Sequence, residues 1–462
     1  MRLADARGGR VMTIPRQGLR ILIVGKDART DAIADACLRS HLEPELFAVS
    51  SCRIPGLMEK CVHVELDRSG NLCDVEFIVR YARAVQPDLV IVGPEEPLAA
   101  GLVDRLEAEL GVPCFGPPQA LAQIESSKAW TRALLEKAGI AGNPAHRSFM
   151  AAAGIREYMS EIGQVVVKPD GLTGGKGVKV LGEHLSNLDE AYEYALQILQ
   201  SDAHVVIEEK LDGEEFSLQS FCDGSSVVHC PPVQDHKRAY AGDTGPNTGG
   251  MGSYSDADLS LPFLRPDDLA AAQRITENVA RAIAVETGRP YRGILYGGYM
   301  VTSNGIKLIE FNSRFGDPEA MNVLSLLKTD FVEICWAVAH DQLAELDVAF
   351  TRKATVCKYV VPEKYPSPGS DGEEISVPAE VLDDGRVRCF WAATQLADDE
   401  VTIHLTGSRA LAVVGVGSTI AEAEEAAEWA ASLVEGPVRH REDIGKAEVV
   451  QARVDHVARL RP

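Results

Sequence analysis

The sequence predicts a multidomain α/β and α+β chain whose first domain is a doubly wound α/β domain. Short apolar runs alternate with helix-like stretches up to about residue 120, which is typical of a parallel sheet covered by helices. After Pro144, strand-like runs instead flank long glycine-rich loops. The 462 residues correspond to three or four domains or subdomains, at roughly 100–200 residues per domain.

The N-terminal domain is predicted over residues 19–120, after a flexible extension (residues 1–18) without clear periodicity. The apolar runs at 19–24 and 88–92 indicate buried parallel strands. Ligands of such sheets bind beyond the carboxyl ends of the strands, so the loops 25–31 and 93–98 are candidate site loops. Ordinary strand-to-helix turns are the alternative. No Gly-x-Gly-x-x-Gly follows the first strand, which argues against a dinucleotide cofactor.

A second domain is predicted over residues 121–345, with a lid subdomain at about 121–190. It begins with a stretch over 119–139 that is predicted to be helical and carries Lys128. A strand at 165–168 then leads into a glycine-rich loop, residues 169–178, whose N–H groups suit phosphate oxygens beside Lys168 and Lys176. Gly177 follows Lys176, so this is not a Walker A loop. A plain hairpin is the alternative.

Another glycine-rich loop, residues 234–255, is the most distinctive stretch of the chain. Lys237 and Arg238 are suited to anionic oxygens, and the following glycines let backbone approach a ligand closely. A long glycine-rich loop inside a compact domain is more often a binding loop than a mobile linker, which is the alternative. Upstream, a strand at 205–209 ends in two carboxylates that could bind sugar hydroxyls or form a solvated turn.

The strand at 306–311 predicts a metal site. Glu310 and Asn312 are two residues apart and therefore share one face of the strand. A carboxylate and an amide oxygen beside a phosphate loop suit Mg²⁺, which prefers hard oxygen ligands. Arg314 follows with a guanidinium that can hold a carboxylate or phosphate bidentately, and Asp317 lies in the next turn.

The rest of the chain predicts a small α+β domain over 346–435, without evident chemistry of its own, and a charged tail over 436–462. The net charge of −22 argues against a nucleic-acid partner or an anionic membrane surface. Ten scattered cysteines form no C-x-x-C pair, and no apolar run reaches 18 residues. Free thiols in a reducing cytosol are the simplest interpretation, so we expect a cytoplasmic protein. We also expect it to act on small molecules, as a monomer or homodimer.

Several motifs together resemble the glycinamide ribonucleotide synthetases, the phosphoribosylamine–glycine ligases of the ATP-grasp superfamily. They are VGPEEPLAAGLVD, VVVKPDGLTGGKGV, VVIEEKLDGEEFS, QDHKRAYAGDTGPNTGGMGSYS and IEFNSRFGDPEAMN. The resemblance implies a central ATP-grasp domain that uses ATP with Mg²⁺ or Mn²⁺. It also implies the reaction: glycine is phosphorylated to glycyl phosphate, and 5-phosphoribosylamine attacks it to give glycinamide ribonucleotide, ADP and phosphate.

The resemblance also implies roles for individual residues. Metal ligands would be Glu310 and Asn312, and catalytic residues would be Lys237, Arg314 and Asp317. ATP would be bound by Lys128, Lys168, Gly174, Gly175, Lys176, Gly177, Glu208, Glu209 and Glu215, with Glu215 at the ribose. The substrates would contact Arg29, Glu95, Arg238, Asn247, Thr248, Gly249 and Gly250.

One turn departs from the family pattern. The family has Gly-Gly-Arg-Glu-His-Ala after the first strand, whereas residues 27–32 read Asp-Ala-Arg-Thr-Asp-Ala. Asp27 and Asp31 are expected to repel a substrate phosphate there unless Arg29 or Lys26 offsets them. A sister ligase with another amine or amino acid is therefore one alternative, and a non-catalytic nucleotide-binding homologue is another. A biotin-carboxylase-like role is disfavoured because no biotin-carrier motif is present.

Overall fold

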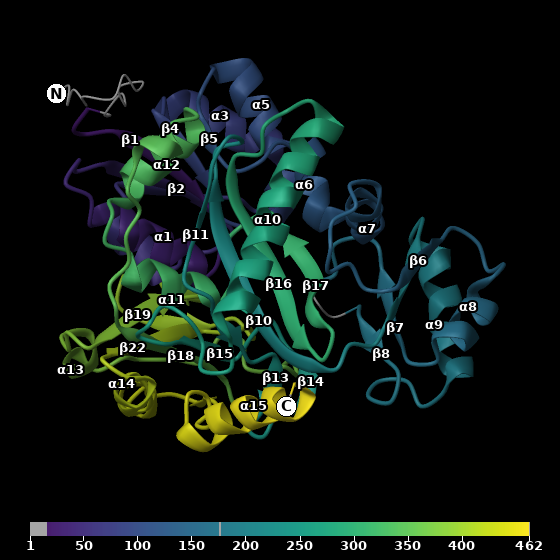
Figure 1. Cartoon of the computed structure of the whole chain (residues 1–462). Coiled ribbons are helices and arrows are strands. Elements are labelled where there is room, and N and C mark those ends of the chain that lie inside the picture. Colours follow the sequence, from purple (N-terminus) through teal and green to yellow (C-terminus); the bar gives the residue numbers. More distant parts are fainter. Residues whose placement is uncertain (1–15, 175–176, 462) are drawn as a thin grey trace.

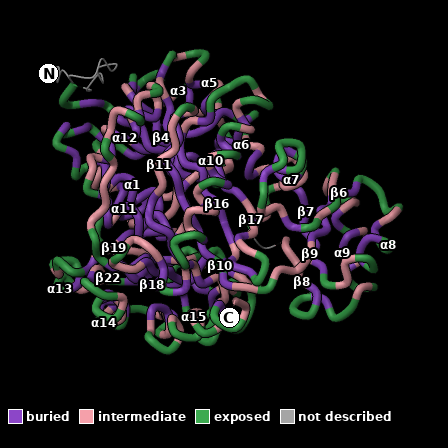
Figure 2. Tube along the Cα trace, in the orientation of Figure 1, coloured by how far each residue is buried: buried purple, intermediate pink, exposed green. Residues whose placement is uncertain are grey.

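The computed structural model describes residues 16–174 and 177–461 of the chain. Three sheets build the main body, and a separate four-stranded sheet with two helices projects to one side of it (Figure 1). Figure 2 shows buried backbone running through the main body, with exposed segments at its rim. No helix within the described ranges is long and apolar enough to cross a membrane.

The N-terminal sheet is fully parallel, in the order β3-β2-β1-β4-β5. Its strands are β1 (Arg20–Val24), β2 (Glu45–Ser50), β3 (His63–Leu66), β4 (Leu89–Val92) and β5 (Cys114–Phe115). Ile21 and Ile23 of β1 enter one core and Leu22 and Val24 enter another, because successive side chains point to opposite faces of the sheet. The strand order reverses between β1 and β4, which places the loops after these two strands side by side.

Helices cover this sheet and lead out of it. They are α1 (Ala28–Leu38), α2 (Pro55–Lys60), α3 (Val75–Val85), α4 (Glu95–Ala99), α5 (Leu102–Leu110), α6 (Gln119–Ser126) and α7 (Lys128–Lys137). The stretch 119–139, predicted to be helical, forms the two helices α6 and α7, because the chain breaks the helix at Ser127. Ser127 has an extended backbone and its hydroxyl accepts a hydrogen bond from Trp130 N, so it caps α7.

The projecting sheet has the antiparallel order β6-β9-β7-β8. It contains β6 (His146–Phe149), β7 (Val165–Pro169), β8 (Lys179–Val180) and β9 (Val205–Glu209), with α8 (Ile155–Ile162) and α9 (Leu188–Ser201). Apolar side chains of these strands and helices form a separate core. The predicted ATP-binding residues Gly175 and Lys176, and most of the predicted flexible extension (residues 1–15), lie outside the described residues.

The central sheet has the order β11-β10-β16-β17 and is also antiparallel. It comprises β10 (Gly213–Cys222), β11 (Val227–His229), β16 (Gly293–Thr302) and β17 (Gly305–Asn312), and the helix α10 (Pro266–Thr287) packs against β16. The carboxyl end of β17 carries Glu310 and Asn312. The chain continues through α11 (Glu319–Leu326), α12 (Phe331–Ala339) and η1 (Leu343–Glu345).

The third sheet joins the 234–255 loop to the C-terminal part of the chain. Its order is β12-β15-β18-β22-β19, with β23 pairing to β18. The two ends of the loop are β12 (Gln234–Asp235) and β15 (Gly252–Ser255), and between them β13 (Arg238–Tyr240) pairs with β14 (Thr244–Asn247). The remaining elements are β18 (Ala354–Pro362), α13 (Ala379–Leu382), β19 (Val387–Trp391), β20 (Thr394–Leu396), β21 (Ile403–Leu405), β22 (Leu411–Gly417), α14 (Ile420–Ser432), β23 (Val438–Arg439) and α15 (Ala447–Leu460).

The segment that we expected as a C-terminal tail ends in helix α15, which packs on β10. His456 of α15 pairs with Glu214 of β10, with 2.6 Å between His456 Nδ1 and Glu214 Oε1. Arg453 of the same helix lies 3.4 Å from Glu214 Oε2. These contacts hold the end of the chain against the central sheet.

Asp31 connects the N-terminal and C-terminal parts of the molecule. Its carboxylate is fully buried, pairs with Lys60 Nζ at 2.6 Å, and accepts a hydrogen bond from Trp391 N of β19 at 2.8 Å. The expected repulsion between Asp31 and a substrate phosphate is therefore wrong, because Lys60 neutralises this carboxylate within the contact between α1 and β19.

We predict that Asp31→Ala destabilises the fold by about 3–5 kcal/mol. The substitution leaves the ammonium group of Lys60 without its partner and the backbone N–H of Trp391 without an acceptor. Thermal and denaturant unfolding midpoints measure the effect. Asp384→Ala serves as the control, since Asp384 pairs with the exposed Arg386, and it should leave the midpoints unchanged. Equal midpoints for the Asp31 variant and the wild type would contradict the prediction.

Candidate active site

A cavity of about 1110 Å³ lies where the three sheets of the main body meet the projecting sheet. Loops after β1 and β4, the start of α7, the 169–178 loop, β9, β10, the 234–255 loop, β17 and the segment before β22 all contribute to its wall. Most of the predicted site residues line it: Arg29, Glu95, Lys128, Lys168, Gly174, Glu208, Glu209, Glu215, Lys237, Arg238, Asn247, Thr248, Gly249, Glu310, Asn312, Arg314 and Asp317. Gly177 and Gly250 do not form part of the wall.

A buried ion-pair cluster organises one side of the cavity. Glu208 of β9 accepts two hydrogen bonds from Arg132 of α7 and lies 2.7 Å from Lys168 Nζ of β7. Burial alone would raise the pKa of Glu208, but the charges of Arg132 and Lys168 outweigh it and lower the pKa to about 2. The glutamate therefore stays ionised and holds the Lys168 ammonium group at the cavity wall. Arg132, which was not predicted, supplies the second charge.

Lys128 stands next to this cluster, at the first position of α7. Its ammonium group donates to Gly171 O at 3.1 Å, and Ala129 N donates to the Asp170 carboxylate at 2.7 Å. Burial and the neighbouring charge of Lys168 lower the pKa of Lys128, although Glu310 opposes this shift. Two lysines and a helix N-terminus thus meet at the 169–178 loop, an arrangement that suits phosphate groups.

Glu310 and Asn312 face the cavity from the end of β17, as their spacing predicts. The Glu310 carboxylate accepts no hydrogen bond from any residue that the structure describes. Burial would raise its pKa, but Lys237, Lys168 and Lys128 together lower it. In the amide orientation that satisfies its hydrogen bonds, Asn312 donates to Glu125 Oε1 at 2.9 Å, which leaves its oxygen as an acceptor. An ionised, unpaired carboxylate beside a free amide oxygen fits a hard divalent cation.

The 234–255 loop forms another part of the wall and is held by its own hydrogen bonds. Thr248 donates from both its N–H and its hydroxyl to Lys237 O, at 2.7 and 3.0 Å. Gly250 lies behind this wall and has φ +113°, and a Cβ there would come within 2.6 Å of Pro318. That geometry requires glycine. The loop is therefore an ordered structure, with Gly250 fixed at a close approach to Pro318.

The basic side chains of this loop already have carboxylate partners. Lys237 Nζ lies 3.4 Å from Glu215 Oε2, and Arg238 Nη2 lies 2.6 Å from Glu183 Oε2. The charge of Glu215 is the main cause of a raised pKa of Lys237, so this ammonium group stays protonated. Glu215, predicted at the ATP ribose, is thus placed beside the predicted catalytic Lys237.

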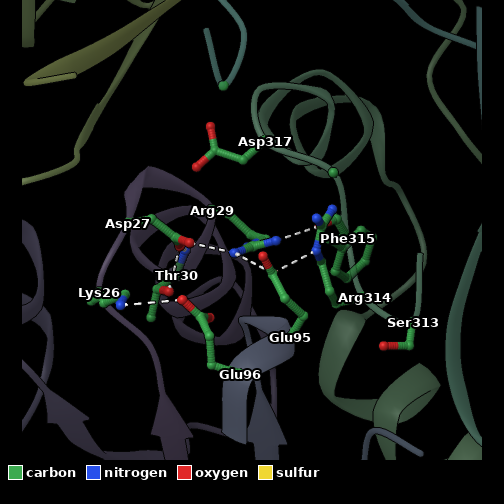
Figure 3. A network of polar contacts seen from close by, with 12 residues as sticks. Lys26, Asp27, Arg29, Thr30, Glu95, Glu96, Ser313, Arg314, Phe315 and Asp317 are labelled. Carbon is green, nitrogen blue, oxygen red and sulfur yellow. Dashed lines mark hydrogen bonds and ion pairs between the residues drawn. The ribbon is translucent and has the colours of Figure 1, made fainter. Parts of the chain in front are cut away.

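A charged network joins the N-terminal domain to β17 (Figure 3). Arg314 donates from Nε to Glu95 Oε2 at 2.9 Å, and its Nη2 lies 2.9 Å from Glu125 Oε1. Arg29 pairs with Asp27, donates to Phe315 O at 2.7 Å, and lies 3.9 Å from Glu95. The Asp27 carboxylate also caps α1 by accepting from Thr30 N at 2.9 Å. Arg29 thus offsets the charge of Asp27, as the sequence suggested it could.

Sequence reasoning missed several groups that shape this cavity, namely Glu125, Arg132, Asp235, Glu319 and Arg409. Asp235 and Glu319 lie inside two of the motifs quoted above, but nothing in those motifs singles them out. Glu125, Arg132 and Arg409 have unremarkable local contexts, and their partners lie far away in the sequence: 76 residues separate Arg132 from Glu208, and 188 separate Glu125 from Ser313. No local motif signals such a pairing. Within the described ranges, no group of three His, Cys, Asp or Glu residues is arranged to hold a metal ion by itself.

Three family profiles match the chain in order. They are the phosphoribosylglycinamide synthetase N domain over residues 19–125, the ATP-grasp (A) domain over 126–320 and the C domain over 355–447. The phosphoribosylamine–glycine ligase of Methanosarcina barkeri is 45% identical over 443 residues, which cover 96% of this chain and 100% of the relative.

Solved structures agree with these matches. The crystal structure of phosphoribosylamine–glycine ligase from Thermotoga maritima has a TM-score of 0.75 at 25% identity, and the match covers 92% of this chain and 100% of that one. The biotin carboxylase domain of Hydrogenobacter thermophilus 2-oxoglutarate carboxylase, solved with MgADP, has a TM-score of 0.72 at 13% identity. It covers 96% of this chain and 94% of that one, and at this identity it shows a shared fold.

Fold and site together define an ATP-grasp enzyme, with a lysine-lined cavity between the projecting sheet and the central sheet. More particularly, the chain belongs to the phosphoribosylglycinamide synthetase family. It contains the N, ATP-grasp and C domains of that family, in that order.

We predict that Glu208→Gln lowers the free energy of unfolding at neutral pH by roughly 3 kcal/mol, since a pKa of about 2 lies well below the unfolded value of about 4.3. This contribution is complete above the unfolded pKa and is lost as the pH falls toward 2. The stability difference between wild type and variant should therefore narrow by roughly 1 kcal/mol at about pH 3.5.

Denaturant unfolding at both pH values measures the Glu208 effect. Glu286→Gln is the matched control, because Glu286 pairs with the exposed Lys137 on the surface. A stability difference for Glu208→Gln that stays constant with pH would show that the carboxylate is not held ionised in the fold.

Proposed function

We propose that this chain ligates glycine to 5-phosphoribosylamine at the expense of ATP, with glycyl phosphate as the intermediate. The main observation behind this proposal is that the unpaired Glu310 carboxylate lies in the field of Lys128 and Lys168. All three residues line one cavity together with the 234–255 loop. Relatives that this chain matches over nearly their whole length bear the name phosphoribosylamine–glycine ligase, which supports the same reaction here.

The first step transfers a phosphoryl group. A glycine carboxylate oxygen attacks the γ-phosphorus of ATP, the bond to the β,γ-bridging oxygen breaks, and ADP leaves. Catalysis of such a step consists mainly of positioning and charge neutralisation. Lys128 and Lys168, together with Gly174 and its neighbours Gly175, Lys176 and Gly177, would hold the phosphates. Glu208, Glu209 and Glu215 would lie along the adenosine.

Glu310 and Asn312 would hold a divalent cation, for which Mg²⁺ is the first choice and Mn²⁺ an alternative. A related fold has been solved with MgADP, and the oxygen donors of this pair suit the same ion. When bound, the cation would neutralise charge on the phosphate oxygens. Glu125 would keep Asn312 oriented by accepting from its amide nitrogen.

The second step forms the amide. The amine of 5-phosphoribosylamine attacks the acyl carbon, the C–O bond to phosphate breaks, and phosphate leaves as the nitrogen loses a proton. Lys237, Arg314 and Asp317 would act at this centre. Arg29, Glu95, Arg238 and the backbone of Asn247, Thr248, Gly249 and Gly250 would bind the two substrates. All ten cysteines are free thiols, which agrees with action in the reducing cytoplasm.

A sister ligase with a different amine or amino acid is the second candidate. The altered turn at residues 27–32 suggested this alternative, and the structure weakens the argument for it. Asp31 is buried against Lys60, away from the cavity wall, and Asp27 is paired with Arg29. Arg29 still lines the cavity, so this turn presents a paired arginine rather than two free carboxylates.

We predict that the purified protein releases ADP from MgATP only when glycine and 5-phosphoribosylamine are both present. A coupled ADP assay, with each substrate omitted in turn, measures this. ADP release at the same rate without the amine, or faster release with another amino acid than with glycine, would overturn the proposed ligase and favour the sister enzyme.

We predict that Glu310→Gln lowers kcat by roughly 10²–10³-fold, because it removes the negative charge that holds the cation at the phosphates. The Mg²⁺ concentration that gives half-maximal activity should rise as well. Glu277→Gln is the control, since Glu277 of α10 pairs with His229 of β11 outside the cavity. An unchanged Mg²⁺ dependence in Glu310→Gln would place the cation elsewhere.

A further inference from the structure

Arg409 is one of the residues through which the third sheet and its connecting segments reach the cavity. It lies two residues before β22 (Leu411–Gly417), and its side chain is 16% exposed at the cavity wall. Its main chain is fixed by a hydrogen bond from Ala393 N to Arg409 O at 3.0 Å. Its guanidinium carbon stands 4.4 Å from the centre of the Tyr359 ring, a cation–π contact with β18. The side chain is therefore held in one orientation by the C-terminal sheet itself.

One nitrogen of this guanidinium joins two separate segments through three backbone carbonyls. Nη1 donates to Gly249 O at 2.8 Å, to Gly250 O at 3.0 Å and to Asp317 O at 3.2 Å. The same nitrogen lies 3.2 Å from the carboxylate of Asp317, whose Oδ1 also accepts from the Tyr359 hydroxyl. Within the described ranges Nη2 has no protein partner. The 234–255 loop and the Asp317 turn thus share a single anchor.

The packing around this anchor leaves little freedom. A Cβ at Gly249 would come within 3.1 Å of the Arg409 guanidinium. Gly250 N donates to Thr248 Oγ1 at 3.1 Å, so the two glycine carbonyls are turned toward Arg409 while the chain returns to β15. Without the arginine, two carbonyls of the loop and the partly buried Asp317 would lose their common donor.

We propose that Arg409 is a positioning residue for the acceptor side of the reaction. It fixes the Gly249–Gly250 backbone against Asp317, so that the C-terminal domain takes part in substrate placement. This inference rests on the proposed function, since it concerns the half of the cavity that would hold glycine and the amine. Small displacements of groups that position substrates can lower the rate of reaction strongly.

The kinetic test compares Arg409→Met with wild type. We expect kcat/KM for glycine or for 5-phosphoribosylamine to fall roughly 10- to 100-fold, while KM for ATP stays within about twofold. Arg409→Lys should recover part of this loss, because an ammonium group can still meet Asp317 but cannot span both glycine carbonyls at once. Arg386→Met, at an exposed position of the same domain, should match wild type.

A second measurement is independent of turnover. Amide hydrogen exchange at Gly250 and Met251 should accelerate at least several-fold in Arg409→Met, with exchange in the N-terminal sheet unchanged. If that variant does not fold, Gly249→Ala displaces the guanidinium without removing a charge and should give the same kinetic pattern. Unchanged exchange, or equal losses for ATP and for the acceptor substrates, would overturn the proposal. If exchange accelerates in Arg409→Met but the enzyme does not use glycine, the positioning role of Arg409 stands and only the proposed function is refuted.

Discussion

The paired, partly buried guanidinium of Arg314 is the interaction on which the site depends. It sits between Glu95 of the N-terminal domain and Glu125 of α6, and Arg29 completes the network through Glu95 and Phe315 O. Burial would raise the pKa of Glu95, but the two arginines lower it to about 2, so the carboxylate stays charged. Breaking such a buried pair by removing one partner is costly, because the other charge is left unsolvated. The network therefore fixes how the N-terminal sheet meets β17.

Local charge matters more than net charge in this molecule. The chain carries a net charge of −22, yet the cavity wall gathers Lys128, Lys168, Lys237 and the arginines around Glu310. Most of these cations pair with a carboxylate next to them on the same part of the cavity wall, as Lys168 pairs with Glu208. A phosphate-binding surface can therefore exist within a strongly acidic protein, since its field is set by groups within a few ångströms.

The third sheet explains why the C-terminal domain belongs to the site. Strands β12 and β15, which bound the 234–255 loop, are hydrogen-bonded into the same sheet as β18 and β22. The loop and the domain that supplies Arg409 are thus parts of one continuous sheet. Motion of one without the other would break backbone hydrogen bonds, which makes the C-terminal domain a structural support of the cavity.

The sequence by itself determined the fold class, the two N-terminal site loops, the Glu310–Asn312 pair and the two glycine-rich loops. These features depend on local spacing: apolar runs, a two-residue strand period, and glycines that permit close approach. Tertiary structure alone decided which charges meet. Asp31 and Asp27 read alike in the sequence, yet one is buried against Lys60 and the other caps α1 beside Arg29. Arg132, Glu125 and Arg409 acquire their importance only through partners distant in the chain, because long-range ion pairs leave no local pattern.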